Sequence, residues 1–106
     1  MKIMKEPFEK IKNGSKTIEV RLYDEKRQSI RVGDKIDFRS IDDPSLSVNA
    51  IVVFLDKFDS FRELFNNFPA NKFGNMGWIN YSKMYEYYSK KDEKKYGTLA
   101  IGIKIT

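Results

Sequence analysis

The chain of 106 residues contains no cysteine and no histidine. Without cysteine it has no disulfide, no thiolate nucleophile and no cysteine ligand for zinc. Without histidine it has no imidazole base for a serine or cysteine nucleophile and no imidazole metal ligand. Any catalysis would use lysine, glutamate, aspartate, tyrosine or threonine. Since no spacing of acidic residues resembles a calcium loop, we expect no metal and no cofactor.

The sequence also lacks long apolar runs, repeats and linkers. No stretch approaches the ~18 consecutive apolar residues of a membrane-spanning helix, and the N-terminus lacks the apolar segment of a signal peptide. With 41% hydrophobic and 33% charged residues, the composition is typical of a soluble globular protein. We therefore expect one domain over residues 1–106, located in the cytoplasm and not in a membrane.

Basic residues outnumber acidic ones. Twenty Lys and Arg against fifteen Asp and Glu give a net charge of +5. In a small domain this excess favours a polyanionic partner, of which nucleic acid is the commonest. Part of the charge lies in residues 89–95, whose lysines are candidate phosphate contacts. Their pattern is more typical of a mobile, solvated loop.

Apolar residues recur at helical spacing in three places. The first predicted helix carries Pro7 in its first turn and ends at Asn13-Gly14. The second begins at Ser60, which with Glu63 has the spacing of a capping box. The third follows a glycine-rich connection. The apolar stripes are Met4, Phe8 and Ile11, then Phe61, Leu64, Phe65 and Phe68, then Tyr81, Met84, Tyr85 and Tyr88.

Two-residue alternation predicts strands at 17–22, 35–39 and 98–105, and a β-branched run predicts a long central strand at 46–55. Residues 23–30 are too polar for a core strand and are expected to form a turn or one helical turn. Turns, and not regular helical crossovers, separate most strands, which argues against a doubly wound sheet. We therefore predict an α+β fold, a small, mostly antiparallel β-barrel flanked by two or three helices.

A helix-ending glycine leads directly into a strand of alternating charge. If 17–22 is extended, Thr17, Glu19 and Arg21 share one face and apolar side chains share the other. Lys16 lies at the start of this strand. Side chains held by a strand are rigid, which suits recognition or chemistry. The alternative interpretation is a solvated face with a surface ion pair worth at most about 1 kcal/mol.

Gly14, Lys16, Glu19 and Arg21 match the G-x-K-x-x-E-x-R signature of the ASCH domain, a branch of the PUA-like barrels. The whole chain resembles a stand-alone ASCH protein. This resemblance implies a PUA-like β-barrel whose cleft, lined by the last three of these residues, binds RNA or a nucleotide-like ligand. The two cations suit phosphate or base acceptors, and Glu19 suits an exocyclic amine. The surrounding motifs are Pro7-Phe8 with Ile11, Val32-Gly33-Asp34 and Tyr96-Gly97.

One bacterial branch of the family consists of acetylcytidine amidohydrolases, which use a lysine, a threonine and a glutamate. Lys16 matches the lysine, but Glu19 stands where that branch has its threonine. Thr17 lies roughly 6–7 Å away along the same predicted strand face. RNA or nucleotide binding is therefore the first functional hypothesis. The alternative is a hydrolase acting on a modified nucleoside or RNA, with Lys16 and Glu19 as catalytic candidates.

Further ligand-binding candidates lie in the second half of the chain. Trp78, in a glycine-rich connection, is hard to explain as a core residue, and Tyr96 and Ser89 could close the cleft from the opposite side. The tyrosines of the third helix could stack on bases, although their spacing is explained more simply by packing. The predicted ligand-binding set is Lys16, Thr17, Glu19, Arg21, Trp78 and Tyr96.

Overall fold

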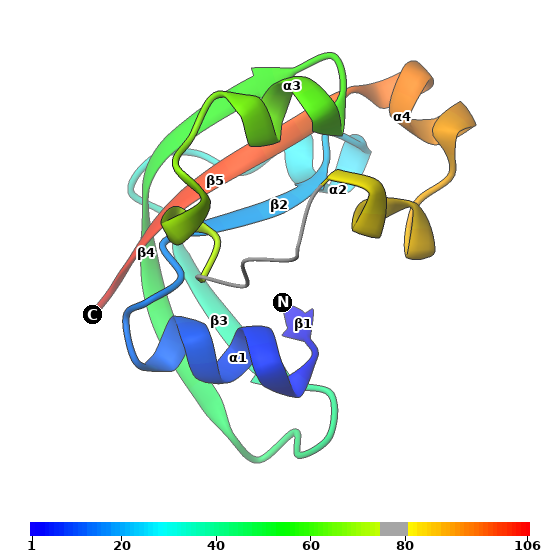
Figure 1. Cartoon of the computed structure of the whole chain (residues 1–106). Coiled ribbons are helices and arrows are strands. Elements are labelled where there is room, and N and C mark those ends of the chain that lie inside the picture. The colour runs from blue at the N-terminus through cyan, green and yellow to red at the C-terminus, as the bar shows by residue number, and fades with distance from the viewer. Residues whose placement is uncertain (75–80) are drawn as a thin grey trace.

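The computed structural model describes residues 1–74 and 81–106. Within these residues, five strands form one curled sheet in the order β1-β3-β4-β5-β2, an open half-barrel (Figure 1). The β1–β3 pair is parallel and the other three pairs are antiparallel. The prediction of a mostly antiparallel α+β fold is therefore confirmed. The strands are β1 (Lys2–Ile3), β2 (Ile18–Leu22), β3 (Lys35–Ser40), β4 (Ser47–Phe58) and β5 (Thr98–Ile105).

Short helices cover the sheet in two groups. In Figure 1, α1 lies near β3, whereas α3 lies along β5 and the chain from η2 to α4 lies beyond β2. The helical turn expected within 23–30 is present as α2. The α-helices are α1 (Lys5–Lys12), α2 (Glu25–Gln28), α3 (Phe61–Asn66) and α4 (Lys90–Tyr96), and the 3-10 helices are η1 (Ala70–Lys72) and η2 (Tyr81–Glu86).

The first helix forms where its apolar spacing predicts it. Phe8 and Ile11 are buried beneath it, and Asn13 and Gly14 end it, the glycine with φ 83°. Met4 departs from the prediction, because it precedes the helix as its N-cap residue and is half exposed. The helix therefore covers the sheet with two apolar residues, and Met4 remains at the surface.

Two apolar clusters lie on opposite faces of the sheet, and β5 contributes to both. Leu99 and Ile101 pack in the cluster beneath α1, whereas Ala100 packs in the cluster beneath α3. Both faces of β5 are therefore buried as far as residue 103, which its two-residue alternation did not predict. Position 102 has room only for glycine, because a Cβ there would lie 2.0 Å from the ring of Phe54.

The prediction of a mobile loop at 89–95 is wrong, because most of it forms α4. The Ser89 hydroxyl caps this helix by accepting from the Asp92 N–H at 3.0 Å. Acidic residues fill the first turn and lysines the last, which stabilises both helix ends. Glu93 is buried and accepts a hydrogen bond from the Phe61 N–H at 2.8 Å. Because the segment lacks an apolar stripe, hydrophobic periodicity could not predict this helix.

The third predicted helix is shorter and tighter than expected, a six-residue 3-10 helix that ends at Glu86. The tyrosines of this stripe pack against the cluster beneath α3, which confirms the packing interpretation for Tyr81 and Tyr85, whereas Tyr88 packs there and also lines the candidate site described below. The second helix also ends early, at Asn66, yet Phe68 still packs on the same cluster. The Ser60 cap is confirmed, because its hydroxyl accepts from the Glu63 N–H at 3.1 Å.

The strands differ from the sequence prediction in one strand that was missed and in the ends of others. The two-residue β1 was not predicted, because so short a segment carries no detectable alternation. The central strand extends past its predicted end to Phe58 and bulges at Val53, which is exposed. The charged strand begins at Ile18 and not at Thr17. This last difference changes the surroundings of Thr17, as described below.

Candidate functional site

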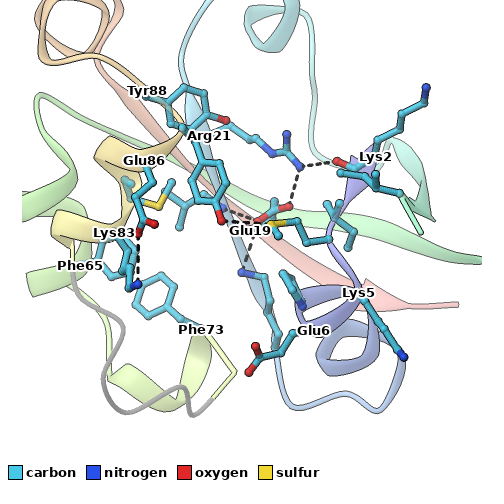
Figure 2. Close-up of a pocket in the computed structure, with 18 of the residues that line it drawn as sticks. Lys2, Lys5, Glu6, Glu19, Arg21, Phe65, Phe73, Lys83, Glu86 and Tyr88 are labelled. Carbon is cyan, nitrogen blue, oxygen red and sulfur yellow. Dashed lines mark hydrogen bonds and ion pairs between the residues drawn. The ribbon is translucent and has the colours of Figure 1, made fainter. Parts of the chain in front are cut away.

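The candidate site lies at the seam of the half-barrel, between its two outer strands, β1 and β2. In β2, Glu19 is opposite Ile101 and Arg21 is opposite Leu99, so both charged side chains lie on the sheet face that α1 covers. The Arg21 Nη2 donates to the Lys2 carbonyl oxygen at 3.2 Å and thereby connects the two strands (Figure 2). A cleft of about 570 Å³ opens here between β1, the start of α1 and η2.

An ionic cluster of Lys16, Glu19 and Arg21 forms the floor of this cleft. The Glu19 Oε1 lies 3.4 Å from the Lys16 Nζ, and its Oε2 accepts from the Arg21 Nη2 at 3.0 Å. The Val20 N–H also donates to Oε1, at 3.0 Å. The lysine and arginine side chains are only 10% and 15% exposed. The interpretation of these residues as a solvated surface pair is therefore wrong, because curling of the sheet encloses them.

The charges in the cluster depend on one another. Burial alone would raise the pKa of Glu19, but the nearby Lys16 and Arg21 lower it below its usual value. Burial alone would lower the pKa of Arg21, but the Glu19 carboxylate and a hydrogen bond with Tyr88 raise it. Glu19 and Arg21 are therefore both charged at neutral pH. With two basic side chains and one carboxylate, the cleft floor has a formal charge of one net positive.

The position of Lys16 is fixed by its backbone. Its N–H donates to the Lys10 carbonyl at 3.0 Å, and it forms an isolated antiparallel bridge with Phe73. Gly74 then turns the chain with φ 101°, where a Cβ would lie 3.4 Å from both Lys10 and Lys16. The helix end, the start of β2 and the turn after η1 thus hold the lysine from three sides.

The rest of the cleft wall is mixed in charge and partly aromatic. Figure 2 shows Phe65 and Phe73 on one side and Lys2 and Lys5 on the other, with Glu19 between them. Basic and acidic side chains are nearly balanced among the described lining residues. The basic ones are Lys2, Lys5, Lys16, Arg21 and Lys83, and the acidic ones are Glu6, Glu19, Asp42 and Glu86.

The other predicted site residues lie elsewhere or outside the described residues. Thr17 lines a separate hollow, on the other side of the backbone that carries Lys16. Tyr96 is the last residue of α4, and Ser89 caps that helix. Neither lines the cleft as far as the structure describes it, nor do the α4 lysines. Trp78 lies outside the described residues.

Three exposed apolar residues at the cleft were missed by the sequence reasoning. Met4, Ile41 and Tyr87 all line it and are 50%, 56% and 62% exposed. The Tyr87 hydroxyl lies 3.1 Å from the Met4 sulfur, so these two residues meet across the cleft. They come from three distant segments, and no sequence pattern joins them. Only the exposure of such large side chains signals a binding surface.

Two kinds of site are not found in the part of the chain that the structure describes. Among residues 1–74 and 81–106, no group of three or more Asp, Glu, His or Cys side chains is arranged to hold a metal ion. Across the same residues, no helix has the length and apolar character needed to cross a membrane.

The half-barrel, its flanking helices and the cleft at its seam define an α+β protein of the PUA-like class. The chain belongs to the ASCH domain family, whose family model matches residues 1–106. The resemblance inferred from the sequence is therefore confirmed. No curated protein matches the chain at a significant level.

Two solved structures share the fold over nearly their whole length. The crystal structure of hypothetical protein PH0355 is 31% identical with a TM-score of 0.85, and the match covers 100% of this chain and 96% of that one. The solution NMR structure of PF0455 from Pyrococcus furiosus is also 31% identical, with a TM-score of 0.77. That match covers 99% of this chain and 94% of the other.

Proposed function

We propose that the seam cleft binds RNA or a nucleotide-like ligand. The observation that carries this proposal is the buried Lys16–Glu19–Arg21 cluster on the floor of an accessible cleft. The Lys16 Nζ has one ion-pair partner, 3.4 Å away, among the described residues, so its remaining N–H donors can bond to a ligand. Removing these charged side chains from water costs free energy, and a ligand that hydrogen-bonds to them offsets part of that cost.

The balance of charge in the cleft favours a nucleotide held by its base over one held by its phosphates alone. Glu19 neutralises one of the two floor cations and can itself accept from a base N–H group. The exposed Tyr87 and Met4 supply an apolar surface against which a flat ring can stack. The cleft volume of about 570 Å³ is within the range of small-molecule sites.

The proposal is tested by a fluorescence-anisotropy titration of short single-stranded and duplex RNA at two salt concentrations. Lys16→Ala is expected to weaken binding about tenfold, because it removes the donor that faces the cleft. The matched control is Lys35→Ala, which removes an equal charge from an exposed position outside the cleft. Equal affinities of the Lys16→Ala and Lys35→Ala proteins would refute the role of the cleft.

A hydrolase acting on a modified nucleoside or RNA is the second candidate, favoured by the contact between Lys16 and Glu19. The described residues that line the cleft include no serine or threonine, so hydrolysis would use a water molecule activated by a carboxylate. In that case Glu19→Gln would bind the substrate but release no product. Undiminished product formation by this variant would exclude Glu19 as the acid or base.

A further inference from the structure

The lysines of α4 all lie on one side of the helix. At 3.6 residues per turn, residues four apart lie one above the other, so these lysines form two adjacent columns within an arc of about 140°. All of them are exposed, whereas Glu93 is buried on the other side of the helix. In Figure 1, α4 lies at the outer edge of the molecule. The columns are Lys90 with Lys94 and Lys91 with Lys95, and we call these four residues the lysine face.

The charge of the lysine face is not neutralised within the protein. Among the described residues, no carboxylate forms an ion pair with any of the four lysines. Two of them are held by aromatic rings. The Lys90 Nζ lies 5.3 Å from the centre of the Tyr85 ring. The Lys95 Nζ lies 5.0 Å from the centre of the Tyr96 ring. A ring orients an ammonium group but leaves it its charge and further N–H donors, so the lysines can still bind an anion.

The stability of α4 does not explain the lysine face. Cations stabilise the C-terminal end of a helix, which accounts for Lys94 and Lys95 in the last turn. The same helix dipole disfavours Lys90 and Lys91, which directly follow the Ser89 cap. Like charges four residues apart also repel each other, and the face contains two such pairs. The lysines of the first turn therefore lower the stability of the helix, and a bound polyanion would relieve the repulsion.

The chemistry of the lysine face favours the phosphate backbone of a nucleic acid. Lysine ammonium groups act as point charges toward phosphate, and several of them close together attract a polyanion. Since α4 contains no aliphatic residue, it lacks the apolar surface with which an amphipathic helix enters a membrane. The helix also begins beside the cleft. Tyr88 lines the cleft, and the Cα of Lys90, two residues later, lies within about 7 Å of its Cα.

We propose that the lysine face of α4 binds the phosphate backbone of RNA, as a contact surface distinct from the cleft. The lysines contact phosphate oxygens, which are the same at every nucleotide, so the face adds affinity without base preference. Phosphates are accessible in single strands and in duplexes, and the face is expected to bind both. The choice of RNA as the polyanion rests on the proposed function of the cleft.

The test uses Lys91→Glu, because RNA affinity and stability should then change in opposite directions. The new carboxylate lies in the first turn and four residues before Lys95. Both placements stabilise the helix, so the urea midpoint should rise. Affinity for short single-stranded and duplex RNA, measured by fluorescence anisotropy at low salt, should fall about tenfold, because repulsion replaces a phosphate contact. The control Lys35→Glu makes the same charge change at an exposed position of β3 and should lose less than about twofold.

A second variant measures the number of phosphate contacts. Lys91→Ala/Lys94→Ala should reduce the salt slope for single-stranded RNA by about 1.4, since each contact contributes about 0.7. The control Lys12→Ala/Lys35→Ala removes the same charge from exposed positions outside α4 and should leave the slope unchanged.

The outcomes separate the lysine face from the cleft. Equal RNA affinities of Lys91→Glu and Lys35→Glu would refute the lysine face and leave the cleft proposal intact. A lower urea midpoint of Lys91→Glu would also refute it, because the lysine would then support the helix. If Lys91→Glu binds weakly while Lys16→Ala and Lys35→Ala bind alike, the lysine face is supported and the cleft proposal fails. If the unchanged protein binds neither RNA, both proposals fail.

Discussion

Glu19 and Glu93 are buried to nearly the same extent, 6% and 8% exposed, but their surroundings differ. Glu19 lies between two cations beside a cleft. Glu93 accepts from the Phe61 N–H at 2.8 Å and from the Tyr85 hydroxyl at 2.9 Å, and it lines neither hollow. One carboxylate therefore belongs to a charged site open to a ligand, and the other joins two helices.

This difference teaches that burial of a carboxylate does not by itself identify a functional site. Neutral donors satisfy Glu93, and its role in fixing the start of α3 against α4 is complete without a ligand. The cluster at Glu19 has spare N–H donors on Lys16 and an adjacent volume in which a ligand can reach them. Counter-ions next to accessible space are the distinguishing feature.

The largest expected effect is that of Glu19→Gln. The variant leaves Lys16 and Arg21 as two buried cations without a counter-ion, which should lower the free energy of unfolding by about 3 kcal/mol. Urea denaturation measures the stability, and the exposed Glu9→Gln is the control, expected within about 0.5 kcal/mol of the unchanged protein. A loss no larger than that of the control would contradict the ionic role of Glu19.

Acid should remove part of the same stabilisation. The folded-state pKa of Glu19 is below its ordinary value of 4.5, so its charged form stabilises the fold fully above that pH. The stabilisation declines as pH falls from 4.5 through the lowered folded-state pKa. The difference in unfolding free energy between the unchanged protein and Glu19→Gln should therefore be constant above about pH 5.5 and shrink below 4.5. A difference independent of pH would contradict the shift.

Glu93→Gln should destabilise the fold less, by about 1.5 kcal/mol, because it weakens hydrogen bonds without stranding a buried cation. Affinity for RNA should stay within about twofold of the unchanged protein, since the residue lines neither hollow. Urea denaturation and anisotropy titration of the same sample measure both quantities. A selective loss of affinity in this variant would remove the distinction between the two glutamates.

Tyr85→Phe should have the smallest effect, a loss of about 1 kcal/mol from the hydrogen bond to Glu93. Burial and that hydrogen bond raise the pKa of Tyr85 from 10.0 to about 12. The raised pKa means that the stabilisation is complete below pH 10.0 and is lost as pH rises through about 12. Ultraviolet difference spectroscopy against the variant should detect a tyrosine that titrates late. Its ordinary titration near pH 10.0 would contradict the contact.

Helices and strands with strong periodicity were predictable because their side chains face one core. Phe8 and Ile11 marked α1, and the Ser60 cap marked the start of α3. The α4 helix was not predictable, because its packing rests on a single buried residue, Glu93, that sequence reasoning assigns to a solvated charge run. Local composition carries no information about a partner 32 residues away.

The candidate site was predictable in its chemistry but not in its shape. The alternation of Glu19 and Arg21 indicated that these two charged groups would share one face of a strand, and the family resemblance added Lys16 to them. It could not indicate that Thr17 would face a second hollow, because that depends on the bridge from residue 16 to Phe73. Nor could the spacing indicate that the exposed Tyr87 would line the cleft. Its position depends on how η2, which ends one residue earlier, packs in the folded protein.

The sequence by itself determined the α+β composition, the positions of most strands, the absence of thiol and imidazole chemistry, and the charged residues of β2. Those properties depend on residue type and on spacing along the chain. Only the tertiary structure decided that Glu19 is buried and ion-paired, that Glu93 is structural, and that Lys16 and Thr17 line separate hollows. Burial and charge pairing depend on which distant segments meet when the sheet curls, and spacing along the chain does not specify those contacts.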